Sequence, residues 1–128
     1  MALAALKKVM AKIEKRNFSK PDETRTFEKG KLELITLGGV TFGRAIFQPG
    51  WRWSTSVKSM VNTESCEVSH LGYIVSGHLR TVMDDGSEEE FGPGDVFSIP
   101  PGHDGWVVGD EPVVAIDITG AGEYAKYD

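Results

Sequence analysis

Two stretches of this sequence combine strand-forming residues, turn glycines and side chains that bind metals. The first spans residues 66–77 and contains Cys66 and His70; the second spans residues 94–103 and ends at His103. Thiolate and imidazole both coordinate divalent metals, and a mixed site suits Zn²⁺ or Fe²⁺. The residue types therefore favour metal binding. The alternative is structural, because a single cysteine is most often a small buried hydrophobe and a single histidine is often a hydrogen-bonded core residue.

Together the two stretches resemble the paired sequence motifs of the cupin superfamily, whose members are small β-barrels with a metal or ligand site inside. The second stretch is the closer match: Gly94, five residues, Pro100, one residue, Gly102 and then a histidine. The first keeps the closing glycine, Gly77, but replaces the usual ligands. The resemblance covers roughly residues 45–118 and is specific for the fold, much less so for the chemistry.

The resemblance implies a set of metal ligands in the first motif. With Gly77 as the frame, His70 takes the place of the family's glutamate. Cys66 and Glu64 take the places of its two histidines. Glu64, Cys66 and His70, joined by His103 from the second motif, are therefore the implied ligands. A thiolate makes such a site softer than the usual cupin site, which favours zinc or iron over manganese.

His103 departs from the family pattern in its position. Cupins usually place this histidine three residues after the motif glycine, where this chain has Gly105. If a strand has already begun at His103, residues 103 and 105 face the same way, and His103 points into the barrel. The alternative is a histidine on an exposed turn.

Three tryptophans lie near the motifs and are candidates for a ligand pocket. Trp51 and Trp53 have the same parity and should share one face of a strand, with Arg52 on the opposite face. Trp106 follows the second motif. Together they would line an aromatic or apolar pocket. Core packing is the alternative, because tryptophan commonly fills the interior of small barrels.

The elements that must position these residues are short strands separated by turn residues. Such spacing, without intervening helices, predicts an all-β fold, and the resemblance specifies a double-stranded β-helix, or jelly-roll, cupin barrel. Gly77, Gly94 and Gly102 are expected at turns that only glycine adopts without strain. The expected strands cover residues 32–37, 40–47, 73–83, 87–91, 95–99, 105–108 and 113–119.

The first residues of the chain have a different pattern. Leu3, Leu6 and Ile13 recur at helical spacing with lysines between them, which predicts a short amphipathic N-terminal helix over residues 2–16. Residues 17–31 are polar and are expected to be irregular. We therefore divide the chain into a helix and lead-in (1–31), a cupin barrel (32–120) and a C-terminal tail (121–128).

Composition limits the classes of partner. The 128 residues suffice for one domain, and the formal net charge of −5 argues against nucleic-acid binding. One cysteine cannot form an internal disulfide, and no apolar run is long enough to span a membrane. We therefore expect a soluble cytoplasmic protein without membrane partners. The resemblance also implies a homodimer, since cupins commonly pair their barrels through edge strands.

Three hypotheses about function follow from these features. The first is a metal-dependent enzyme that acts on a small organic substrate inside the barrel. The second is a non-catalytic module that binds or senses a small ligand, with or without metal. The third is a structural subunit that assembles through its N-terminal helix. The sequence identifies neither the reaction nor the substrate, so whether the protein is an enzyme stays open.

Overall fold

Two antiparallel β-sheets make up the protein, in a computed structural model that describes residues 12–61 and 63–119. The larger sheet has the strand order β1-β2-β3-β9-β4-β7, and the smaller has the order β6-β5-β8. The strands of the larger sheet are β1 (Glu23–Phe27), β2 (Gly30–Leu37), β3 (Val40–Phe47), β9 (Val113–Thr119), β4 (His70–Ser76) and β7 (Val96–Ile99). Those of the smaller sheet are β6 (Glu88–Phe91), β5 (His78–Met83) and β8 (His103–Val108).

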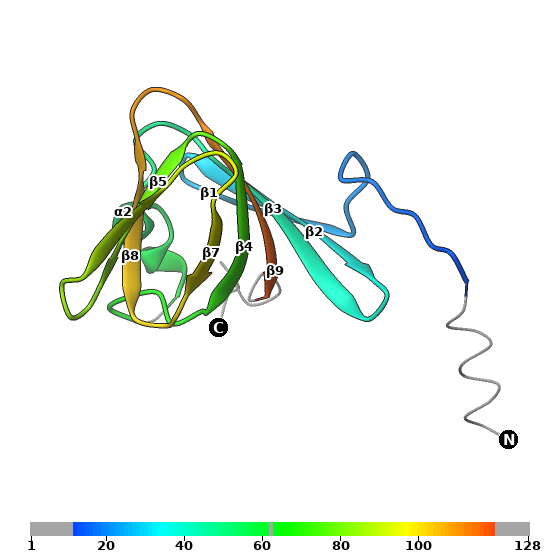
Figure 1. Ribbon diagram of the computed structural model, residues 1–128, viewed down its shortest axis with the longest axis horizontal. Helices are drawn as coiled ribbons and strands as arrows, with labels where there is room; N and C mark the ends of the chain where they lie inside the picture. Colours follow the sequence, from blue (N-terminus) through cyan, green and yellow to red (C-terminus); the bar gives the residue numbers. More distant parts are fainter. Residues whose placement is uncertain (1–11, 62, 120–128) are drawn as a thin grey trace, which may run out of the picture.

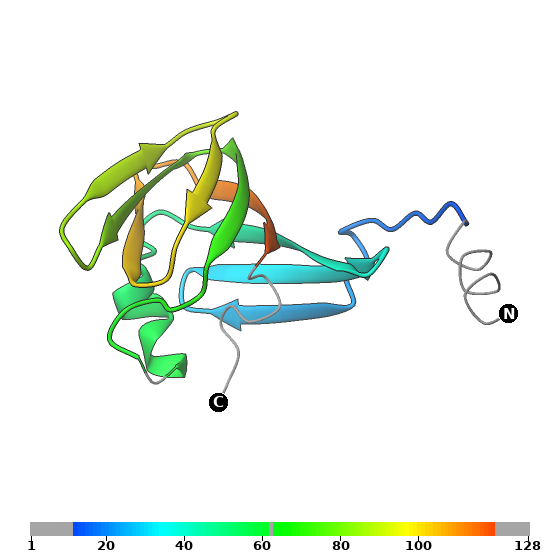
Figure 2. The same ribbon diagram turned by 60° about the horizontal axis from the view of Figure 1, so that its bottom comes forward.

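The smaller sheet curves over one half of the larger one, so that the two together form a barrel (Figure 1). Strands β4, β7 and β9 form one wall and β5 and β8 the other (Figure 1). The β2–β3 hairpin extends beyond the barrel in both views (Figure 2). Apolar side chains from both sheets and from residues 51–57 fill the interior, among them Leu32, Phe47, Trp51, Trp53, Val57, Ile74, Leu79, Phe97, Val107 and Val113. The expected all-β barrel is therefore confirmed.

Strict alternation along three strands decides which side chains face the interior. In β8, residues 103, 105 and 107 are buried, while the residues between them are partly exposed. Phe97 and Ile99 of β7 are likewise buried, and so are Val113, Ala115 and Asp117 of β9. Because successive side chains of a strand point to opposite faces, each strand delivers one inward row. Asp117 is the polar member of an otherwise apolar row.

The lead-in is more regular than the sequence indicates. Residues 17–31 were expected to be irregular, but β1 forms within them and pairs with β2 from Glu23 to Phe27. The strand is largely exposed and polar except for Phe27 at its end, so it gives little hydrophobic signal. Backbone pairing with β2, and not burial, defines it. The sheet therefore begins before residue 32.

The helical prediction for residues 2–16 is not supported where the structure describes it. Residues 12–16 are not helical, and Ile13 is fully exposed; residues 2–11, like the expected tail at 121–128, lie outside the described residues. Helical turns occur instead in mid-chain, as α2 (Trp53–Ser56) and the 3₁₀ turn η1 (Lys58–Met60). Trp53 thus begins a helix and does not lie on the expected strand.

Gly77 separates two strands where a single run over residues 73–83 was expected. It lies between the last residue of β4 in one sheet and the first residue of β5 in the other, with φ at 79°. A Cβ atom at this position would lie 2.3 Å from the carbonyl oxygen of Pro112. Gly94 also has a positive φ, 87°, but a Cβ atom there would have no neighbour within 4 Å. The chain passes between the sheets at a point where only glycine fits.

These two glycines provide a matched pair of substitutions. We expect Gly94→Ala to lower the free energy of unfolding by about 1–2 kcal/mol, because only backbone strain is added. Gly77→Ala adds the same strain and a steric conflict with the Pro112 carbonyl, so its cost should be clearly larger. Urea unfolding of both variants measures the difference. Equal losses would show that the close approach at Gly77 is relieved without cost.

Candidate metal centre

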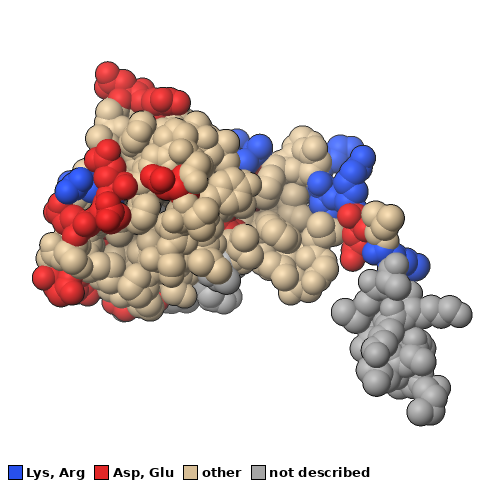
Figure 3. All heavy atoms as spheres, viewed as in Figure 1, with Lys and Arg blue, Asp and Glu red and all other residues tan. Residues whose placement is uncertain are grey.

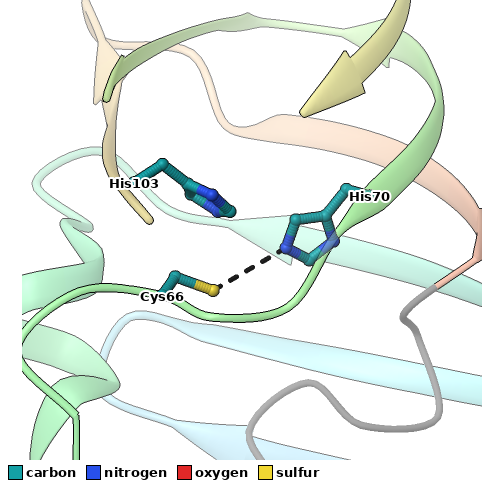
Figure 4. A group of neighbouring side chains, drawn as sticks. All are labelled: Cys66, His70 and His103. Carbon is teal, nitrogen blue, oxygen red and sulfur yellow. Dashed lines mark hydrogen bonds between the residues drawn. The ribbon is translucent and has the colours of Figure 1, made fainter. Parts of the chain in front are cut away.

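Two side chains of the first motif and one of the second meet at one end of the barrel. One ligand atom each of Cys66, His70 and His103 lies within 4.8 Å of the other two (Figure 4). The Cys66 sulfur is 3.8 Å from Nε2 of His70, and the two imidazole rings are 5.2 Å apart between centroids. Sulfur and nitrogen ligands on one tetrahedral zinc ion would be about 3.5 Å apart. The cluster therefore has close to the spacing of a metal site.

Backbone pairing holds Cys66 against His103. The amide of Cys66 donates to the carbonyl oxygen of His103 at 2.7 Å, and the amides of Gly102 and His103 donate back to the Cys66 carbonyl. The turn at Gly102, with φ at 91°, makes this pairing possible. His70 is the first residue of β4 and points towards the other two (Figure 4). Each motif thus delivers its ligands from a fixed backbone.

Both imidazole rings are oriented by a hydrogen bond from Nδ1. Nδ1 of His70 donates to Oδ2 of Asp117 at 2.5 Å, and Nδ1 of His103 donates to the carbonyl oxygen of Pro100 at 2.8 Å. Because carboxylate and carbonyl oxygens accept hydrogen bonds, these bonds place the ring proton on Nδ1 and make Nε2 the candidate metal-binding atom. Metal-binding histidines usually have such partners, which fix the tautomer and the ring orientation.

Burial favours the neutral forms of Cys66 and His103. Burial raises the pKa of the Cys66 thiol to about 11, and the negative charges of Glu67, Asp104 and Asp117 add to this effect. Burial lowers the pKa of His103, so its imidazole is neutral near pH 7. A neutral imidazole is ready to coordinate, whereas the thiol must lose its proton to the solvent as a metal binds.

An apolar cavity of about 60 Å³ adjoins the cluster. Its walls are mostly aromatic and aliphatic, with polar groups contributed by His70, Thr81, His103 and Asp117. In the described part of the chain it is lined by Ala45, Phe47, Trp51, Trp53, His70, Leu79, Thr81, Phe97, Ile99, His103, Gly105, Ala115 and Asp117. The arrangement can hold a metal ion at one end and a small molecule beside it.

The structure brings together three of the four expected ligands. Glu64 is the exception: its side chain is 97% exposed and its carboxylate pairs with Lys58 at 2.8 Å. The physical reason is that residues 63–65 and 67–69 lie in a loop, so parity with Cys66 does not place Glu64 on the inward side. Glu64 does not belong to the cluster that the structure forms.

Of the three tryptophans expected to line a pocket, two do so and one does not. Trp51 and Trp53 are 4% and 2% exposed and line the cavity. Trp106 does not, because it alternates with the inward residues His103 and Gly105 and faces out of β8. There the guanidinium of Arg52 lies over its indole ring, 4.2 Å from the centroid. Only two of the three expected pocket tryptophans therefore contact the cavity.

Asp117 belongs to the site and was not expected there. Its Oδ2 accepts the hydrogen bond from His70, while its Oδ1 is buried without a partner among the described residues. The sequence does contain a signal for it. Asp117 interrupts the apolar strand Val113–Thr119 at the parity of Val113 and Ala115, so an inward carboxylate could have been anticipated.

Comparison with known proteins agrees with this geometry. Residues 60–119 match the family model described as the cupin domain. The matched residues span both motifs, and the barrel agrees with the match, which supports a small domain of the cupin superfamily in this chain. A search of curated proteins found no match.

Solved structures with the same fold include proteins with and without a known activity. A protein of unknown function from Rhizobium leguminosarum has a TM-score of 0.60 at 20% identity, over 84% of this chain and 96% of that one. A cupin-like protein from Thermotoga maritima has a TM-score of 0.52 at 17% identity, over 86% and 81%. At these identities the likeness shows the fold alone.

Oxalate decarboxylase from Bacillus subtilis, described with Mn(II) centres, is a third match. It has a TM-score of 0.55 at 16% identity, over 87% of this chain but only 32% of the enzyme. This chain therefore corresponds to about a third of the enzyme's length.

The described residues include no helix with the length and apolar character needed to cross a membrane.

The raised pKa of Cys66 predicts that the metal-free protein loses stability at alkaline pH. The folded state keeps the thiol proton up to about pH 11, whereas the unfolded chain releases it near about pH 8.5. The contribution is therefore complete below about pH 8.5 and is lost as the pH rises towards 11. In chelator, raising the pH from about 7.5 to about 10 should cost wild type on the order of 1–2 kcal/mol more than Cys66→Ala.

Urea unfolding at both pH values measures this difference. Cys66→Ala is the control because it keeps every other group that titrates at alkaline pH. The same pH dependence in the variant and in wild type would mean that the thiol is not shielded as the structure indicates.

Proposed function

We propose that this protein is a metal-binding cupin in which Cys66, His70 and His103 hold one divalent transition-metal ion beside a small-ligand cavity. The observation that carries the proposal is the convergence of the three side chains within 4.8 Å, with Nδ1 of both imidazoles already hydrogen-bonded. A structural role for the histidines does not require the remaining nitrogens to face a buried sulfur.

The donor set favours zinc or iron. One sulfur and two imidazole nitrogens suit these ions, whereas manganese prefers oxygen ligands. Once bound, the ion would supply Lewis acidity or an oxygen-binding centre to a ligand in the cavity. The chain's own contribution is to orient the ligands and to exclude water, because aromatic and aliphatic side chains form most of the cavity wall.

Oxalate decarboxylation is not proposed for this chain, because a likeness to the enzyme at 16% identity shows the fold alone. The proposal is a metal-dependent site for a small molecule in the cavity. The alternative is a binding module without metal, which the same cavity would also support.

Metal content is the direct test of this proposal. Protein purified without a chelator or a metal-affinity tag should contain close to one zinc or iron ion per chain by elemental analysis. Cys66→Ala and His70→Ala should each lose most of it, because two remaining ligands hold such an ion weakly. The matched control is His78→Ala, which removes an exposed histidine outside the cluster.

Each result has a clear meaning when the variants remain folded by circular dichroism. Loss of metal in the two cluster variants but not in His78→Ala supports the proposed centre. A metal-free wild type that also fails to take up added zinc would contradict it and leave the binding module.

We also propose that two copies of the chain associate through the outer face of β4 and its neighbours. Every outward side chain on β4, β7 and β9 with described burial is uncharged, and Tyr73 pairs with Val96 on one side and Ile116 on the other. Acidic groups gather instead over β5 and β6, and the area over β4 and β9 is largely uncharged (Figure 3). For two chains of net charge −5, an uncharged face permits the closest approach. The exposed apolar members are Leu71, Tyr73, Val75, Val96 and Ile118.

A charge placed in this face should separate the copies. We expect wild type to have twice the 14.0 kDa monomer mass by light scattering, and Val96→Lys to shift it towards the monomer. Val96 is 77% exposed, so the substitution should leave the fold intact. The control is Val40→Lys, an exposed valine at the far hairpin. A wild-type monomer at high concentration would refute the dimer.

A further inference from the structure

A second cavity lies beside the one that adjoins the metal cluster. Its volume is about 150 Å³, against about 60 Å³ for the inner cavity, and the buried residues Thr81 and Ile99 line both. Backbone pairing also brings this outer cavity close to the cluster. Ile99 pairs with His70, and Met83, another lining residue, pairs with His103. Strand neighbours of both histidines therefore form part of its wall.

The outer cavity lies between two strands that do not pair with each other. β6 is an end strand of the smaller sheet, and β7 is an end strand of the larger one. Phe91 of β6 and Phe97 of β7 close part of the gap between them, with ring centroids 5.8 Å apart. Glu89 and Phe91 of β6 and Ser98 of β7 line the cavity. The gap therefore gives a molecule in solution a way to the wall that the two cavities share.

Glu89 places a carboxylate at this opening. It pairs with Thr81, and paired residues of neighbouring strands point to the same face of a sheet, so Glu89 shares the inward face of Thr81. Its neighbours Glu88 and Glu90 instead form salt bridges with Arg80. The carboxylate of Glu89 accepts a hydrogen bond from the Glu90 amide at 3.1 Å but has no ion pair among the described residues. The described part of the chain therefore leaves this charge available to a ligand.

We infer that the outer cavity is the entrance to the proposed metal site and holds the cationic end, such as an ammonium group, of a ligand whose other end reaches the inner cavity. Glu89 recognises the cationic end by its charge, and Phe91 adds an aromatic ring, whose face attracts cations. The inference rests on the proposed function for the identity of the inner site. The charge preference itself concerns the outer cavity alone.

Cys66 is the only cysteine of the chain, so labelling of its thiol reports the arrival of a molecule at the cluster. Two methanethiosulfonate reagents provide matched probes, because one carries a trimethylammonium group and the other a sulfonate on the same two-carbon chain. The Cys66 thiolate attacks the reagent's sulfur, a disulfide forms and methanesulfinate leaves. Mass spectrometry of full-length, chelator-treated protein gives both rate constants. Because both reagents need the same thiolate, its population cancels from their ratio.

The cation-to-anion ratio of rate constants is divided by the same ratio for urea-unfolded protein, which removes the intrinsic reactivity of the reagents. We expect Glu89→Gln to lower this normalised ratio at least about threefold, because loss of the carboxylate slows the cation and speeds the anion. The matched control is Glu90→Gln, which removes the same charge from a residue outside the cavity lining and should change the ratio much less. Both glutamates are exposed, so both variants should remain folded.

The outcomes separate this inference from the proposed metal site. A larger effect of Glu89→Gln than of Glu90→Gln supports the inference. Equal ratios in wild type and both variants, an equal fall in the two variants, or no reaction of the folded protein would overturn it. Zinc added before the reagents tests the metal centre by itself. Protection of Cys66 supports that centre, whereas unchanged labelling contradicts it and leaves the comparison of the two variants valid.

Discussion

The backbone pairing of Cys66 with His103 is the constraint on which the site depends. It joins a loop after η1 to the first residue of β8, two segments that no continuous ladder of the sheets connects. Hydrogen bonds between backbone groups are insensitive to side-chain identity, so this pairing fixes the positions of both ligands whatever the side chains are. Gly102 makes it possible, because its φ of 91° turns the chain back after Pro100 and Pro101. The positions of Cys66 and His103 therefore depend on the turn at Gly102.

The neighbouring strands β4 and β9 orient the remaining residues of the site. β4 begins at His70 and directs its ring towards the Cys66 sulfur, while β9 directs Asp117 behind the ring. β4 and β9 are themselves neighbours in the larger sheet, so the His70–Asp117 hydrogen bond forms across a strand pair. Gly72 contributes to this closeness, since a Cβ atom there would lie 1.9 Å from the carbonyl oxygen of Ile116. The close packing of β4 against β9 therefore also allows Asp117 to orient the His70 imidazole.

The sequence predicts the barrel and the three residues of the candidate metal cluster, but not the whole site, and particular residues show why. Parity along a strand correctly places His103 inside, because β8 begins at that residue and alternates without a bulge. Parity fails for Glu64, since the chain around it is not a strand. Trp106 follows the rule: its parity is opposite to that of His103, so it faces outward, and the pocket prediction had overlooked this. β1 escaped notice because an exposed edge strand is defined by its partner and has no apolar pattern of its own. The inward position of Asp117 could have been predicted from its parity in the strand, but its contact with His70 depends on the pairing of β9 with β4, which is a tertiary fact.

Asp117 also lowers the stability of the fold that contains it. An inward carboxylate on an apolar strand, with one oxygen unpaired among the described residues, costs stability relative to an apolar residue of similar size. The hydrogen bond to His70 offsets part of that cost but does not require the second oxygen. The carboxylate therefore has a role that apolar packing does not explain, and the structure shows that role to be the orientation of the His70 imidazole.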